Sequence, residues 1–128
     1  RASVWKQKQV FDKALADYND AIQLSPTATS LNGRAWLLAT CPDEKFRDSQ
    51  QAVTDATKAC ELTQWKNATY LDTLAAACAE ASDFAAATKW QEQAKSLVPE
   101  AKQADYDVRL QLYREEKPYR EVPKTDSP

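Results

Sequence analysis

The chain of 128 residues contains no histidine and no methionine. Histidine is the commonest general base and the commonest metal ligand in proteins, so neither a Ser-His-Asp nor a Cys-His arrangement can be built from this chain alone. Adjacent carboxylates such as Glu115 and Glu116 fall on a segment of alternating charge, where nothing implies an apolar pocket that would raise one pKa. The sequence therefore predicts no catalytic residue, no cofactor and a protein that is not an enzyme.

Glycine is almost absent too, because Gly33 is the only one, and three of the six prolines fall in the last eleven residues. Tight β-hairpins depend on glycine-containing turns, so we do not expect a β-sandwich or barrel. No apolar run approaches the ~20 residues that a membrane span needs. The 17 basic and 19 acidic residues form no long run of one sign that would follow a phosphate backbone. We expect no nucleic-acid and no membrane partner, and the sequence leaves the localisation undetermined.

The three cysteines, Cys41, Cys60 and Cys78, stand 19 and 18 residues apart. An odd number at this spacing fits neither a disulfide framework nor the short paired spacings of a zinc site. We interpret them as small buried apolar residues, since free cysteine is among the most buried residue types, and a redox or metal role is the alternative. No metal site is predicted.

What the sequence does contain is helical periodicity, with apolar residues at i, i+3, i+4 and i+7 along successive segments. The residue before a proline leaves the helical region, so Ser25-Pro26 and Cys41-Pro42 mark helix ends. Thr29 or Ser30 is expected to cap the second helix, and Asn67 the fourth. The predicted helices span residues 11–24, 29 or 30 to 41, 49–62, 67–81, 84–97 and 100–116.

The helices also repeat one pattern of small and large residues. Equivalent alanines stand 38 and 35 residues apart, and only helical-hairpin repeats have this period and alternation. The three copies in the second helices read Ala14-x3-Tyr18-x2-Ala21, Ala52-x3-Ala56-x2-Ala59 and Ala87-x3-Gln91-x2-Ala94.

On these residues the chain resembles the tetratricopeptide repeat family, over residues 1–99. The third unit, residues 68–101, matches without a gap, with small Ala75 expected to face Ala87 and Ala94 at close approach. The second unit carries five extra residues in the turn between its helices. That turn, residues 41–48, and residues 35–40 before it are similar to a variant of the family in planctomycete-like bacteria.

The resemblance implies an all-α, right-handed superhelix of about three helical hairpins plus a C-terminal capping helix. We expect one domain over residues 1–116, made of a partial repeat (1–26), two repeats (28–64 and 68–101) and the capping helix (100–116). Residues 117–128 are expected to form an extended or disordered tail. Residues 1–5 match only the end of a first helix, so we expect more repeats or another domain before Arg1. Weak self-association is then expected through the incomplete N-terminal edge, with Phe11, Leu15 and Tyr18 exposed.

The candidate site also follows from the resemblance, because first helices line the concave groove in that family. Trp36 is the candidate anchor for a partner, with packing in the core as its alternative. Only Lys6 and Asn32 suit the groove clamp that grips C-terminal carboxylates in one subset of the family, while Asp72 and Glu80 have the wrong sign, so we do not expect an Hsp70 or Hsp90 tail as ligand. The predicted groove residues are Lys6, Asn32, Trp36, Thr40, Thr69, Asp72, Ala76 and Glu80.

The function expected from this resemblance is a protein-interaction module, part of a larger protein, that binds a peptide or partner protein in the groove. Two alternatives stay open. One is a structural or self-association element, and the other is a regulatory appendage of an enzymatic domain upstream.

Overall fold

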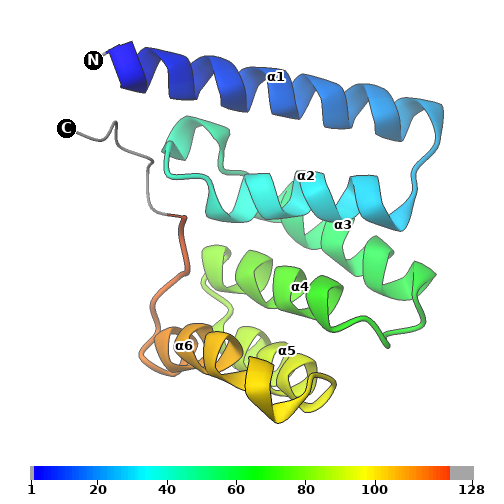
Figure 1. The fold of residues 1–128 in the computed structure, drawn as a ribbon, viewed down its shortest axis with the longest axis vertical. Coiled ribbons are helices and arrows are strands. Elements are labelled where there is room, and N and C mark those ends of the chain that lie inside the picture. Colours follow the sequence, from blue (N-terminus) through cyan, green and yellow to red (C-terminus); the bar gives the residue numbers. More distant parts are fainter. Residues whose placement is uncertain (1, 122–128) are drawn as a thin grey trace.

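The computed structural model describes the backbone of residues 2–121 and the side chains from residue 8 onward, and no strand occurs in that range. The all-α class predicted from the sequence is confirmed. The helices follow one another in a stack along the long axis of the molecule (Figure 1). Their bounds are α1 Ala2–Leu24, α2 Ala28–Thr40, η1 Glu44–Phe46, α3 Ser49–Leu62, α4 Ala68–Glu80, α5 Phe84–Ser96, η2 Glu100–Lys102 and α6 Gln103–Arg114, where η marks a 3₁₀ helix.

Helix starts are set by side chains that accept the free N–H groups of the first turn. Asn67 accepts from the Tyr70 N–H at 3.1 Å, so its predicted role as N-cap is confirmed. The cap predicted for the second helix is wrong: α2 begins at Ala28, because the Thr27 hydroxyl accepts from the Ser30 N–H at 3.2 Å.

Helix ends are made without glycine. Gln64 and Trp65 after α3, Ser82 after α4 and Glu116 after α6 all adopt left-handed φ values between 58° and 66°. Each such residue costs roughly 1–2 kcal/mol relative to an ordinary conformation. The single glycine, Gly33, is instead inside α2, where it serves close packing.

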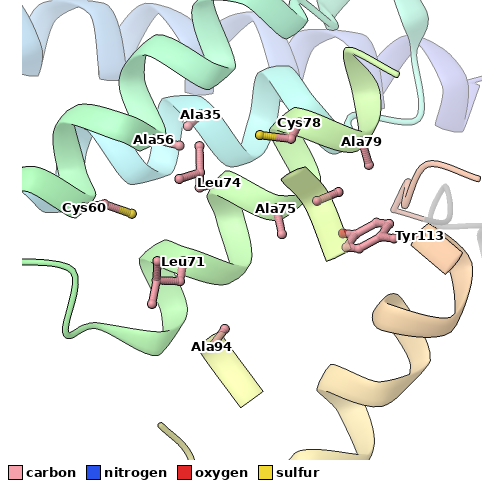
Figure 2. Packing of buried hydrophobic residues seen from close by; sticks show 11 residues of the cluster. Ala35, Ala56, Cys60, Leu71, Leu74, Ala75, Cys78, Ala79, Ala94 and Tyr113 are labelled. Carbon is pink, nitrogen blue, oxygen red and sulfur yellow. The ribbon is translucent and has the colours of Figure 1, made fainter. Parts of the chain in front are cut away.

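The helices pair in hairpins, α2 with α3 and α4 with α5, and α4 also packs against α2 and α3. The second helix of each pair lies behind the first, and α6 packs against α5 (Figure 1). Every residue from Leu71 to Ala79 of α4 is buried. Ala75, Ala87 and Ala94 have no exposed surface and share one core cluster with Tyr113, as Figure 2 shows for Ala75, Ala94 and Tyr113. Small side chains thus let α4 lie at the centre of the stack.

The first helix corrects one expectation. α1 runs unbroken from Ala2 to Leu24, so residues 2–5 are not the end of a separate helix. No proline and no capping signal falls between Trp5 and Phe11 that would stop it. The side chains expected to be uncovered find partners within the chain: Phe11 meets Phe46 edge to face at 5.7 Å, Leu15 packs against the core and Tyr18 lies over Gly33. Self-association through this edge stays a prediction, but these three side chains no longer supply a reason for it, because they are already packed within the chain.

The expected extended or disordered tail begins at residue 117. Residues 117–121, named here the C-terminal segment, are extended, but they do not leave the fold. They turn back from α6 and run along the stack toward α2 (Figure 1). Residues 122–128 of the expected tail lie outside the described residues. The segment therefore lies on the same side of the stack as the predicted groove residues.

Candidate functional site

The candidate site is an open hollow of about 340 Å³ between α1, α2 and α4. Residues four apart, or three and four apart, share one face of a helix, so Asn32 and Trp36 lie together on α2 and Thr69, Asp72 and Thr73 together on α4. The packing of α2 on α4 brings these two faces side by side. The hollow is lined by Tyr18, Asn32, Gly33, Trp36, Thr69, Asp72 and Thr73. Four of these belong to the eight predicted groove residues.

One wall of the hollow depends on the only glycine. A Cβ at Gly33 would come 2.4 Å from Cε1 of Tyr18, so the tyrosine ring can cover α2 at this point only because no side chain is there. Beside this wall, the Asn32 Oδ1 atom is buried and has no hydrogen-bond partner among the described residues. An unpartnered buried acceptor is costly, and this one belongs to a residue that lines the hollow.

Asp72 closes the floor of the hollow through an ion pair. Its Oδ1 accepts from Nε of Arg109 at 2.8 Å, and both side chains are largely buried. The same guanidinium lies 5.3 Å from the ring of Tyr106 and 5.5 Å from the ring of Tyr119. Asp72 therefore links α4 to α6, and its negative charge is already neutralised by Arg109.

The C-terminal segment lies beside the hollow, on the face formed by α2, α4 and α6, named here the groove face. The Glu121 N–H donates to the Thr40 carbonyl at 2.8 Å, and Nε1 of Trp36 donates to Oε1 of Glu121 at 2.7 Å. Arg120 donates to both carboxylate oxygens of Glu80, each at 3.1 Å. The rings of Trp36 and Tyr119 are 5.8 Å apart. One extended stretch of chain thus occupies the end of the groove face next to Trp36.

Trp36 packs in the core, which is the alternative to its predicted role as partner anchor, and the anchor role stays a prediction. Its ring is half-buried and packs against the core cluster of Leu38, Ala39 and Ala76, while its indole N–H reaches the C-terminal segment. It is therefore part of the core on one side and part of the groove face on the other.

Two predicted groove residues neither line the hollow nor contact the segment through their side chains. Ala76 is fully buried, because α2 packs directly on that side of α4. The Thr40 side chain is 1% exposed and its hydroxyl donates to the Trp36 carbonyl at 2.7 Å, so only its own carbonyl meets the segment. The side chain of Lys6 lies outside the described residues. The remaining five, Asn32, Trp36, Thr69, Asp72 and Glu80, line the hollow or hold the segment.

The sequence did not single out Tyr18, Gly33, Arg109 or the C-terminal segment as parts of this site. Pro118, which favours extended backbone at its neighbour, is the one local signal for the segment. The contacts themselves join residues far apart in the chain, such as Trp36 and Glu121, which periodicity within a helix cannot reveal.

The three cysteines lie in the core and do not form a reactive site. All are free and buried, as predicted. Burial raises the pKa of Cys60 to about 12 and of Cys78 to about 11, so both stay protonated at neutral pH. Among the described residues, no three His, Cys, Asp or Glu side chains are grouped as metal ligands. In the same range no helix combines the length and apolar character of a membrane span.

Comparison with known proteins adds no assignment. No family model matches the chain, and no curated protein and no solved structure matches it either.

Proposed function

We propose that the chain is a tetratricopeptide-type solenoid that binds an extended peptide of a partner protein along the groove face. The repeated dimensions of its hairpins support this proposal: α2, α4 and α5 have 13 residues each and α3 has 14. In addition, α2, α4 and α6 run in the same direction across the stack (Figure 1). A stack of this kind presents one long face built from first helices, which suits recognition of an extended chain.

The observation that carries the proposal is the C-terminal segment on the groove face. It lies there as a peptide would, with one main-chain hydrogen bond to Thr40, a ring contact and an indole hydrogen bond with Trp36, and an ion pair between Arg120 and Glu80. The groove face thus has the spacing and the hydrogen-bonding groups that an extended backbone needs. The adjoining hollow supplies further polar groups that the segment does not use.

The test uses the full chain with Tyr119→Ala and Arg120→Ala, named here the released chain, because these changes remove the ring contact with Trp36 and the ion pair with Glu80 and so weaken the hold on the attached segment. The probe is the capped peptide acetyl-Glu-Lys-Pro-Tyr-Arg-Glu-amide, which has the sequence of residues 116–121. NMR titration of the labelled chain should show saturable shifts of the Trp36 indole signal. The unchanged chain should bind the peptide more weakly, because its attached segment competes at an effective concentration of about 1 mM.

Two controls frame this titration. Trp36→Ala in the released chain should abolish binding, followed through the backbone signals of α2, whereas Lys58→Ala on the exposed side of α3 should leave it unchanged. Circular dichroism checks that both variants keep their helices. No saturable binding by the released chain, or equal binding after Trp36→Ala, would overturn the proposal.

A further inference from the structure

The C-terminal segment is held through three consecutive side chains, each by a different kind of contact. The ring of Tyr119 meets Trp36 at 5.8 Å and the guanidinium of Arg109 at 5.5 Å. Arg120 meets Glu80, and the carboxylate of Glu121 accepts from the indole N–H of Trp36. The groove face therefore has one position for a ring, one for a cation and one for an acceptor, in that order.

We infer that the partner peptide of the groove face is an extended segment in which an aromatic residue, an arginine and an acidic residue follow one another. This inference rests on the proposed function and specifies its ligand. The attached segment then acts as a built-in occupant that the partner displaces.

The middle position is selective for arginine over lysine. Nε and Nη2 of Arg120 each meet a different oxygen of Glu80 at 3.1 Å, which is the two-pronged geometry of a guanidinium on a carboxylate. Nε of Arg47 lies 3.8 Å from Oε1 of the same carboxylate and adds a second positive charge beside it. The ammonium group of a lysine does not hold two N–H donors side by side in one plane. It would therefore replace only one of the two hydrogen bonds to Glu80.

A partner can displace the attached segment because the segment is tethered. The Lys117 N–H donates to the Leu112 carbonyl at 2.9 Å, which holds the residues before Tyr119 at the end of α6. The hydrogen bonds of the segment include none to Asn32, Thr69 or Thr73 of the hollow. The residues of a partner that precede its aromatic residue carry no such tether and can enter the hollow. The partner thereby gains contacts that the attached segment never makes.

The C-terminal segment is also held less firmly than the helices of the core. It has one main-chain hydrogen bond to α2, and the side chain of Arg120 is 43% exposed. Segments with few buried contacts open at low free-energy cost compared with the core. Displacement therefore leaves the buried cluster around α4 intact.

The experiment compares four peptides on the released chain by the same NMR titration. The reference has the sequence of residues 116–121, the second replaces its arginine by citrulline, the third replaces its tyrosine by alanine and the fourth scrambles the order. Citrulline keeps the shape of arginine without its charge, so it should bind about tenfold more weakly. The alanine and scrambled peptides should also bind at least several-fold more weakly than the reference. In the released chain carrying Glu80→Gln, the reference and citrulline peptides should bind equally.

The outcomes separate this inference from the proposed function. Equal binding of the reference and scrambled peptides would overturn the inference, while the groove face would remain a peptide-binding surface. A preference for arginine that persists after Glu80→Gln would overturn the assignment of the middle position. Failure of all four peptides to bind would overturn the proposed function itself. Sedimentation of the unchanged chain adds a last outcome: a dimer that disappears in the released chain would identify a second copy as the occupant and overturn the partner peptide.

Discussion

At the scale of single residues, one buried ion pair joins the first complete hairpin. Asp55 on α3 is 2% exposed and accepts from Nε and Nη2 of Arg34 on α2 at 2.6 and 2.8 Å. Gln51 donates to the same carboxylate at 2.8 Å. The hydrogen bond that Arg34 donates to Asp55 raises the pKa of Arg34, so the guanidinium stays charged at every pH of interest. The pair thus holds two helices together through charges that are largely out of water.

Removing the carboxylate should be costly, because it leaves the Arg34 charge without its partner. Asp55→Ala is expected to lower the free energy of unfolding by about 3 kcal/mol. The matched control is Arg114→Ala, since the pair of Arg114 with Glu92 is more than half exposed on both sides and should contribute less than about 1 kcal/mol. Urea denaturation measures both variants. Equal losses in the free energy of unfolding would show that the buried ion pair stabilises the fold no more than the exposed one.

Gly33 and Tyr18 make a second prediction at this scale. Glycine inside a helix costs about 1 kcal/mol relative to alanine, so Gly33→Ala should stabilise the chain where space allows. Tyr18 removes that space, because its ring stands where the new Cβ would lie. Gly33→Ala should therefore gain about 1 kcal/mol in a Tyr18→Ala background, and less than that or nothing in the unchanged chain. A double-mutant cycle by urea denaturation measures the difference, and a gain that is the same in both backgrounds would contradict the contact.

At the scale of elements, α4 decides how the others can pack. It is buried from Leu71 to Ala79 and touches α2, α3 and α5. Five of those nine residues are alanine or cysteine, which have small side chains. A central helix of small residues lets its neighbours approach closely. This close packing leaves no space for larger side chains on α4.

Ala75→Leu should therefore overpack the core around α4 and cost about 1–3 kcal/mol. The exposed Ala85 on α5 offers a matched control with the same substitution, and Ala85→Leu should change stability by less than about 0.5 kcal/mol. Thermal and urea denaturation of the two variants give the comparison. If both curves overlay that of the unchanged chain, the close packing of α4 on α5 is wrong.

At the scale of the whole molecule, burial opposes the ionisation of thiol and phenol groups, most strongly at two cysteines and one tyrosine. Burial raises the pKa of Cys60 to about 12, that of Cys78 to about 11, and that of Tyr113 well above its ordinary value. In the unfolded chain the thiols release their protons near pH 9. Between these values the folded state binds more protons than the unfolded state. Stability should therefore hold up to about pH 9 and fall as the pH rises further.

Urea denaturation at pH 8, 9.5 and 10.5 tests this decline. The variant with Cys60→Ala and Cys78→Ala should lose stability less steeply over the same range, because the two thiols with the largest pKa shifts are gone. It should also be less stable at pH 8 through the loss of packing in the core, so only the slope is compared. A pH dependence that is unchanged in the double variant would show that the thiols do not govern it.

The sequence by itself determined the all-α class, the bounds of α2 to α6 to within three residues and the burial of the small residues and cysteines, but it missed the first nine residues of α1. These features depend on interactions between residues about four apart, such as the cap of Asn67 on Tyr70, or on the mean preference of a residue type for the interior. It also placed Asn32, Trp36, Thr69 and Asp72 on faces that the structure brings together around one hollow.

Only the tertiary structure decided where the end of the chain lies and which groove residues remain exposed. Trp36 and Glu121 are 85 residues apart in the chain, and Asp72 and Arg109 are 37 apart. No periodicity encodes such contacts, because they depend on how α2, α4 and α6 stack and on the direction in which the chain leaves α6. The same stacking buries Ala76 under α2 and occupies the carbonyl of Thr40. A residue on the predicted face of a helix becomes part of the groove only where no neighbouring element covers it.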